Sequence, residues 1–398
     1  MVRKCRIVGL GLGILAVGVA SGLVAQQPAT TNTANVADTL VNQCANIRFG
    51  ELVLIKGGTR DQQMLEDIAV EVRKLGAHPL ITIGSDSLTH KMLTEVPAKF
   101  DTQDPSFALK MAETVDAVIS VDFTERLDLL ADVSAERLTN QNKTFEPVYK
   151  KMLERGVLQV HLGNGLYPTT ARAKQFGITK SELSRIFWNG VNTDYDRLQS
   201  TGARVKNILA SGQTVRIIAP NGTDLTVEIT QRPVFISDGV ISSEDRYAGG
   251  PACQVWLPAG EVYVTPVPKT ARGTFVADNF FFEGKHIKGL KLMFRDGKLT
   301  SMTSKSDITA LQERYQAAPE GRDVFAAIDI GINPSVQTPS GSRMVTWMAA
   351  GTISIGIGNN TWAGGDNDVP FDLFAHLTNG KLTVDRKTIV DRGKLLDR

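Results

Sequence analysis

The N-terminal half of the chain contains the feature that most constrains its fold, a short apolar run, an amphipathic helix and a second apolar run. Residues 51–56 have the length and apolar content of a buried strand, and 79–83 have the same character. Between them, apolar residues recur at helical spacing, at Leu65, Ile68, Ala69, Val72 and Leu75. A strand, a crossover helix and a strand form a right-handed parallel unit, which 116–121 and 157–161 are expected to extend.

Gly57 and Gly58 follow the first of these strands, where a phosphate-binding loop would stand. Neither the pattern G-x-G-x-x-G nor the pattern G-x-x-x-x-G-K-[ST] occurs there. The pair therefore indicates a tight turn into a helix rather than a nucleotide site.

The second half has a different pattern, with strands paired around turn signals. Pro-Asn-Gly at 220–222 separates the runs 215–219 and 225–229, and Asp-Gly separates 290–295 from 298–302. Both arrangements predict β-hairpins.

We therefore predict an α/β fold with an N-terminal parallel βα layer and a C-terminal mixed α+β part rich in antiparallel hairpins. The predicted boundary near residue 210 gives an N-terminal α/β domain over 41–210 and a C-terminal mixed domain over 211–398. A chain of 398 residues, of which 42% are apolar, is long enough to build two such domains.

Residues 1–25 have the pattern of an export signal. Arg3, Lys4 and Arg6 form a positive start, and an uncharged run of apolar and small residues follows. Cleavage would leave 26–40 as a flexible tether. We expect a periplasmic or secreted protein that contacts the membrane only through this signal. The alternative is an uncleaved membrane anchor, because the run is just long enough to span a bilayer.

The charge of the chain argues against a nucleic-acid partner. The formal net charge is +2, and the export segment holds three positive residues and no acid, so the rest carries 2 − 3 = −1. Outside that segment the cysteines are Cys44 and Cys253, and their spacing does not decide whether they pair.

Glu261 stands in the stretch 257–266, LPAGEVYVTP, where a Pro-Ala-Gly turn leads into an apolar, β-branched run. A side chain at the point where a strand leaves a loop is held rigidly at a cleft edge, which suits a metal ligand or a general base. The alternative is a solvated charge that fixes a turn.

Seven motifs follow one another along the chain: FGE at 49–51, RKLGA at 73–77, PTTARA at 168–173, NGTDL at 221–225, LPAGEV at 257–262, GINP at 331–334 and GGDN at 364–367. In this order they resemble the motifs of the thermophilic aminopeptidase family, the metallo-exopeptidases typified by aminopeptidases T and S. The resemblance implies a two-domain enzyme that releases N-terminal residues from peptides and tends to form homodimers. It also implies two divalent metal ions in the C-terminal part, held by two Glu, two His and an Asp.

The family's ligand positions are largely altered in this sequence. Glu261 matches the first Glu. The other positions fall on Ala327, Ser354, Asp372 and Phe374, with Asp329 as the acid nearest to Ala327.

We therefore predict a divalent metal ion, Zn, Co, Mn or Mg, on Glu261, Asp329 and Asp372. Oxygen ligands alone favour Mg²⁺, Ca²⁺ or Mn²⁺ over Zn²⁺. Additional candidate ligands are Asp366, Asp368 and His376, although residues 366–368 have above all the composition of a turn. Asp329 lies within an apolar run, and an acid buried there needs a partner, a metal ion or a raised pKa. The alternative is that strand alternation turns Asp329 outward and leaves it exposed.

Three functions remain open from the sequence. The first is an aminopeptidase with a reorganised, carboxylate-rich metal site. The second is a non-catalytic protein that binds a peptide or a partner in the same cleft. The third is another chemistry on this scaffold; a related group of pyridine-ring dioxygenases uses iron, but it needs the His-x-Asp pair that Phe374 interrupts. A fold does not fix a function, so the site has to decide.

Overall fold

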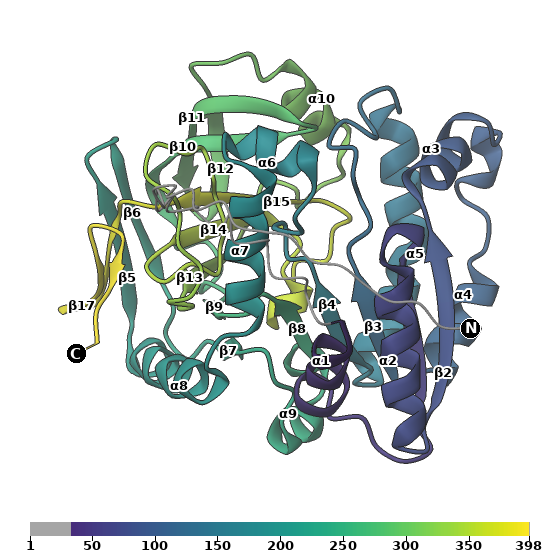
Figure 1. The fold of residues 1–398 in the computed structure, drawn as a ribbon. Coiled ribbons are helices and arrows are strands. Elements are labelled where there is room, and N and C mark those ends of the chain that lie inside the picture. Colours follow the sequence, from purple (N-terminus) through teal and green to yellow (C-terminus); the bar gives the residue numbers. More distant parts are fainter. Residues whose placement is uncertain (1–32, 398) are drawn as a thin grey trace, which may run out of the picture. The chain divides into compact units, whose positions relative to one another are not determined.

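The N-terminal layer is a parallel five-stranded sheet with helices on both faces (Figure 1). The structure is a computed structural model and describes residues 33–397. In spatial order the strands are β2 (His78–Gly84), β1 (Leu52–Gly58), β3 (Ala117–Val121), β4 (Leu158–Leu162) and β8 (Gln254–Leu257). The four strands predicted in the N-terminal half are therefore confirmed, each within two residues of its predicted bounds.

Helix α2 (Gln62–Lys74) is the predicted crossover between β1 and β2. It packs its apolar stripe, with Leu65 and Ile68 at the centre, into the main core. On the opposite face, α4 (Ser106–Thr114) and α5 (Ala135–Glu154) cover a smaller apolar cluster around Val118. Helix α3 (Asp86–Thr94) precedes α4.

Three helices lead into the C-terminal part: α6 (Thr170–Phe176), α7 (Lys180–Val191) and α8 (Tyr195–Ser211). The N-cap predicted at Thr179 is confirmed, because its hydroxyl accepts a hydrogen bond from the backbone N–H of Glu182 (3.1 Å).

The predicted flexible tether is wrong for residues 33–40. Helix α1 (Thr33–Asp38) and a π-helical turn (Thr39–Cys44) occupy this segment. Val36, Ala37 and Leu40 are buried in the main core, so apolar burial outweighs the polar composition that suggested disorder. The predicted export signal and the start of the tether lie outside the described residues.

The C-terminal part contains two antiparallel sheets. The larger has the order β12 (Lys298–Thr303), β11 (Lys285–Arg295), β10 (Arg272–Phe282), β6 (Thr223–Glu228), β5 (Thr214–Ala219), β16 (Lys381–Val384), β17 (Lys387–Asp391) and β18 (Lys394–Leu395). It includes both predicted hairpins, β5–β6 and β11–β12. Short helices α9 (Ser243–Ala248) and α10 (Thr309–Ala317) complete this part.

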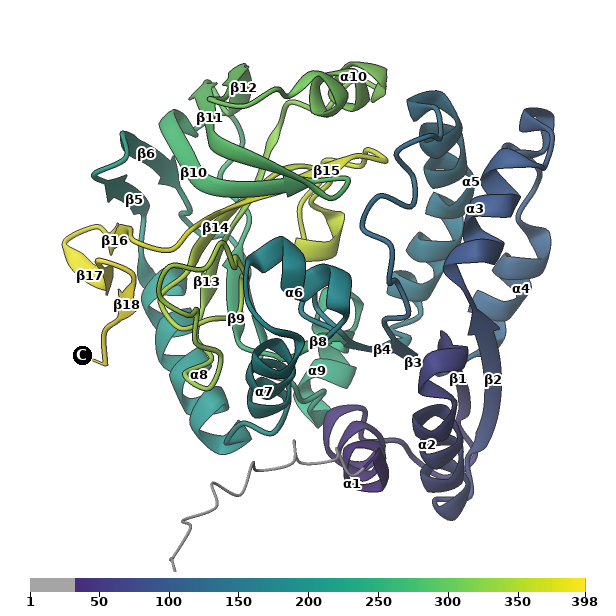
Figure 2. The same cartoon turned by 45° about the horizontal axis from the view of Figure 1, so that its top comes forward.

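The smaller antiparallel sheet, called the site sheet below, has the order β15 (Asp372–Leu377), β14 (Ile353–Gly358), β13 (Phe325–Gly331), β9 (Glu261–Val264) and β7 (Val234–Ser237). The long hairpin β10–β11 lies against β15 (Figure 2). Fold class is thus as predicted: a parallel βα layer followed by antiparallel sheets.

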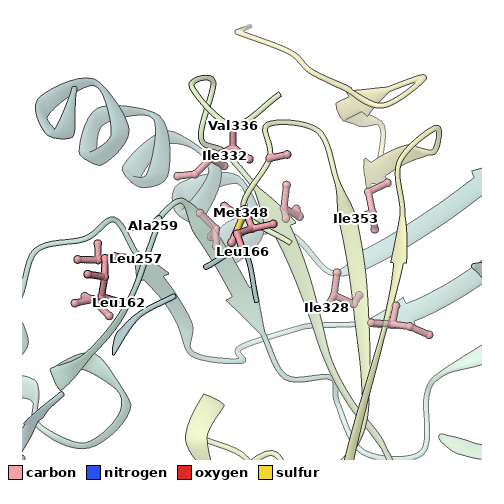
Figure 3. Close-up of a cluster of buried hydrophobic side chains, with 14 of the residues drawn as sticks. Leu162, Leu166, Leu257, Ala259, Ile328, Ile332, Val336, Met348 and Ile353 are labelled. Atoms are coloured by element: carbon pink, nitrogen blue, oxygen red, sulfur yellow. The ribbon is translucent and has the colours of Figure 1, made fainter. Parts of the chain in front are cut away.

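One apolar core runs from the parallel sheet into the site sheet. Figure 3 shows part of it, with Leu162 and Leu257 from β4 and β8, and Ile328 and Ile353 from β13 and β14. Strand β8 follows residue 210 in sequence but pairs with β4, and residues 33–397 fall within one compact unit. The division into domains at 210 stays a prediction.

Cys44 and Cys253 are both buried and free, so they form no disulfide with each other. None of the helices among residues 33–397 is both long and apolar enough to cross a membrane.

Candidate functional site

A cavity of about 590 Å³ lies between helix α5, one face of the site sheet and the loops beside it. Its acidic lining residues are Glu146, Glu261, Asp329 and Asp372. Its aromatic lining residues are Phe145, Tyr149, Trp256, Tyr263, Trp347, Trp362, Phe371 and Phe374. This size and lining suit an organic ligand with a polar group at one end.

The strand register places a row of polar side chains on the face of the site sheet that forms the cavity floor. Asp329 of β13 lies opposite Tyr263 of β9 and opposite Ser354 of β14, and Ser354 lies opposite His376 of β15. Directly opposed residues share a face of the sheet. Glu261 shares that face too, because it stands two residues before Tyr263.

Glu261 begins β9, as the sequence predicted, but it is not a solvated surface charge. Its side chain is only 5% exposed, and its Oε1 accepts a hydrogen bond from Nδ2 of Asn164 (2.8 Å). Burial raises the pKa of Glu261 to about 8, against the smaller opposing effect of that hydrogen bond.

Asp329 is the second buried acid of the floor, with 6% exposure. Burial, and then the charge of Glu261, raise the pKa of Asp329 well above its usual range. Its Oδ1 has no hydrogen-bond partner among the described residues, and neither has the hydroxyl of Tyr263 beside it. The two acids therefore form one electrostatic pair in an apolar setting.

Asp372 lines the same cavity but does not join this pair. It is exposed, and on β15 it lies opposite Gly358, four residues along β14 from Ser354. At about 3.3 Å per residue this offset is roughly 13 Å along the strand, too far for Asp372 and Asp329 to bind one ion.

The residues present do not fit the family's pair of metal ions. Within residues 33–397, no three His, Cys, Asp or Glu side chains are grouped so that they could hold a metal ion. Ala327, two residues before Asp329, offers a methyl group, and Phe374 offers a ring that packs edge-on against Trp362. The trio of ligands that the sequence predicts does not converge, because only Glu261 and Asp329 lie together.

Ser354 and His376 form a buried pair next to the acids. The Ser354 hydroxyl lies 2.9 Å from Nδ1 of His376, and the imidazole stacks on Trp347 with the ring centroids 4.9 Å apart. Burial lowers the pKa of His376 to about 4, so the ring is neutral at neutral pH. Neither residue is among those that line the cavity, so this serine is not presented to a ligand.

Asn164 is a site residue that sequence reasoning missed. Besides Glu261, its Nδ2 contacts the carbonyl oxygen of Pro258 (3.0 Å), and its Oδ1 accepts a hydrogen bond from Nε1 of Trp347 (2.6 Å). Its φ is 42°, a left-handed value that is uncommon for residues other than Gly and Asn, and it stands between Gly163 and Gly165. The signal that could have revealed it is Gly-Asn-Gly directly after a predicted strand.

An ion-pair bridge spans the cavity rim. Lys150 of α5 pairs with Glu146 one turn earlier (2.9 Å) and with Asp368 of the loop between β14 and β15. Of the additional ligand candidates, Asp368 is thus engaged by a lysine. Asp366 is exposed on the same loop.

Known proteins resemble this chain in sequence and in fold. Residues 29–321 match the family model described as thermophilic metalloprotease (M29). Wild-type AmpT from Thermus thermophilus has the same fold with a TM-score of 0.72 and 18% identity, over 92% of this chain and 99% of that chain. A 2,5-dihydroxypyridine dioxygenase from Pseudomonas putida KT2440 has a TM-score of 0.59 and 14% identity, over 92% and 97%. At these identities the two structures show the fold alone. A search of curated protein sequences gave no match.

Proposed function

Since the chain belongs to the family of thermophilic metalloproteases (M29), we propose that it is an aminopeptidase-like protein that binds the end of a peptide in this cavity, without the family's two-metal hydrolysis. We also propose that it is exported, because its N-terminal residues have the pattern of a signal peptide.

The observation that carries this proposal is what stands at the family's ligand positions. Glu261 keeps its place on the cavity floor, whereas Ala327, Ser354 and Phe374 offer no acid or imidazole. Two metal ions that activate a water need several such donors around them. The aromatic side chains that line the cavity can bury an apolar ligand group, which supports binding.

A metal-dependent aminopeptidase is the second candidate, and one observation favours it. Glu261 and Asp329 are close enough for the charge of Glu261 to raise the pKa of Asp329, and two carboxylates are a common start for a divalent metal site. Such a site would have to recruit its remaining ligands from water or substrate.

The test is a peptide titration of the purified protein, read by tryptophan fluorescence. Three of its four tryptophans, Trp256, Trp347 and Trp362, line the cavity, so the signal reports on this site. We expect saturable binding of a tetrapeptide after chelation of divalent metals, and no cleavage of an aminoacyl chromogenic amide. Failure to bind peptides without metal contradicts the proposal.

Metal analysis separates the two candidates. A near-stoichiometric divalent metal, with amide cleavage that E261Q abolishes, would establish the metal-dependent enzyme instead. Reconstitution with Zn²⁺, Co²⁺, Mn²⁺ and Mg²⁺ covers the four ions that the sequence predicts.

A further inference from the structure

The cavity floor presents hydrogen-bonding groups that the protein itself does not use. Oδ1 of Asp329 and the hydroxyl of Tyr263 have no partner among the described residues, although the two side chains are only 6% and 1% exposed. Both residues line the cavity. Buried polar atoms without a partner are costly, which marks this floor as a place for a ligand that donates hydrogen bonds.

The charged side chains that line the cavity are all acidic, and the lysine of the rim, Lys150, is already paired with Glu146 and Asp368. Four acidic residues are among its lining residues, and no Lys, Arg or His is. The amide N–H groups of Asn164 and the indole N–H of Trp347 already donate hydrogen bonds within the protein, so they are not available to an anionic ligand. Burial raises the pKa of Glu261 and of Asp329, and a positive group beside them favours their ionised forms. The complementary ligand group is therefore positive.

The walls above the floor are aromatic. Trp362 lies between Tyr263 and Phe374, with ring centroids 5.1 Å and 5.6 Å away, and Trp347 lies 6.5 Å from Phe374. Aromatic faces attract organic cations and bury large apolar groups. The walls thus match an organic cation better than a bare metal ion, which needs oxygen or nitrogen donors on several sides.

We propose that Glu261, Asp329 and Tyr263 bind a primary ammonium group directly, and that the aromatic walls hold a large apolar group next to it. An ammonium group has three N–H donors, one for each of these side chains. This inference rests on the proposed function, where it makes the N-terminal amine of a peptide with a large first residue the ligand. A small arylalkyl amine carries the same chemistry.

The experiment compares ligands that differ only at the ammonium group. The probes are Phe-Ala-Ala-Ala, its N-acetylated form, its analogue with 3-phenylpropionyl in place of Phe, and 2-phenylethylamine. Binding is measured by tryptophan fluorescence and calorimetry with metals chelated. We expect the free peptide to bind about 10- to 100-fold more tightly than the two blocked peptides, since charged hydrogen bonds in a buried site have effects of this size.

The outcomes separate the two levels of the argument. Equal binding of free and blocked peptides overturns the ammonium site but leaves the proposed peptide binding in place. Binding of 2-phenylethylamine alone supports the ammonium site and overturns the peptide as ligand. Absence of binding for every probe overturns both.

Variants then locate the ammonium group. D329N and Y263F are expected to reduce the preference for the free over the acetylated peptide at least fivefold, while apolar affinity for the blocked peptides persists. The matched control is D224N, which removes an exposed acid paired with Arg216 outside the cavity lining. An unchanged preference in both site variants, with retained folding by circular dichroism, contradicts the assignment; the comparison of ligands on the unaltered protein does not depend on either variant.

Discussion

The parallel sheet and the site sheet each hold a serine hydrogen-bonded to a histidine on the neighbouring strand. In the parallel sheet, Oγ of Ser120 lies 2.6 Å from Nδ1 of His161, and in the site sheet the same contact between Ser354 and His376 is 2.9 Å. Each imidazole also stacks on a tryptophan, His161 on Trp256 at 5.9 Å and His376 on Trp347 at 4.9 Å. Burial lowers the pKa of both histidines to about 4.

The two pairs differ in the residue across the next strand. Lys56 lies opposite Ser120, and its charge lowers the pKa of His161 further, whereas Asp329 lies opposite Ser354. For His376 only burial acts on the pKa, although an acid is near. The comparison teaches that a Ser–His contact is a way to pack a neutral histidine in either sheet. What distinguishes the site sheet is its pair of buried acids.

The largest expected effect concerns Glu261, one of the two buried acids that distinguish the site sheet. Because the folded-state pKa of Glu261 is raised to about 8, its contribution favours folding at low pH and is lost as pH rises from about 4 to 8. E261Q keeps an oxygen for Asn164 and removes this loss. We expect it to raise the free energy of unfolding by about 3 kcal/mol more at pH 8 than at pH 5. Urea unfolding at both values measures this, with D224N as control, and equal effects at the two pH values contradict the raised pKa.

The second prediction tests whether the two histidines are alike. Each has a folded-state pKa near 4 against about 6.5 unfolded, so protonation of the unfolded chain lowers stability as pH falls from 6.5 to 4. We expect H161N and H376N each to reduce the loss of stability between pH 7 and pH 5 by roughly 2 kcal/mol. An effect in one variant and not in the other breaks the comparison.

The third prediction removes the hydroxyl from each pair. S120A and S354A are each expected to lower the free energy of unfolding by about 1 kcal/mol, the usual effect of one hydrogen bond. Peptide binding should stay unchanged in S354A, because this serine does not line the cavity. Loss of binding or of any amide cleavage in S354A alone would give the site-sheet pair a chemical role.

The smallest expected effect concerns Lys56, the residue opposite Ser120. Replacing Lys56 with Met removes a positive charge that faces His161, so the pKa of His161 should rise by a fraction of a unit while that of His376 stays constant. Titration of the two imidazoles by NMR compares them in one sample. Movement of both values would show that a global change, and not this charge, is responsible.

Local patterns were enough to predict much of the fold but only part of the site. The turn at 257–260 predicts Glu261 at a strand start, which is confirmed. The apolar run around Asp329 leaves open whether this acid is buried or exposed, and the structure buries it. Glu261 and Asp329 lie together because β9 pairs with β13. These strands are far apart in the chain, since β9 ends at Val264 and β13 begins at Phe325, and no local sequence pattern contains the register of their pairing.

The misses have the same physical origin. The resemblance places Asp372 at a ligand position of the family, but its position along β15, opposite Gly358, separates it from the acid pair. Asn164 enters the site from the end of β4, in the other sheet, through contacts with Pro258 and Trp347. The polar composition of the segment that includes residues 33–40 predicts a flexible tether, but the apolar side chains of Val36, Ala37 and Leu40 are buried in the core.

The bridge of Lys150 across the rim has a consequence for kinetics. It joins α5 to the loop before β15 at a partly exposed position, whereas the acids of the floor are shielded from solvent. Dissolved salt screens exposed charges far more than buried ones. Ionic strength should therefore govern how quickly a ligand enters, whereas the buried floor should set how long the ligand stays bound, so that the rates of association and dissociation depend on separate parts of the molecule.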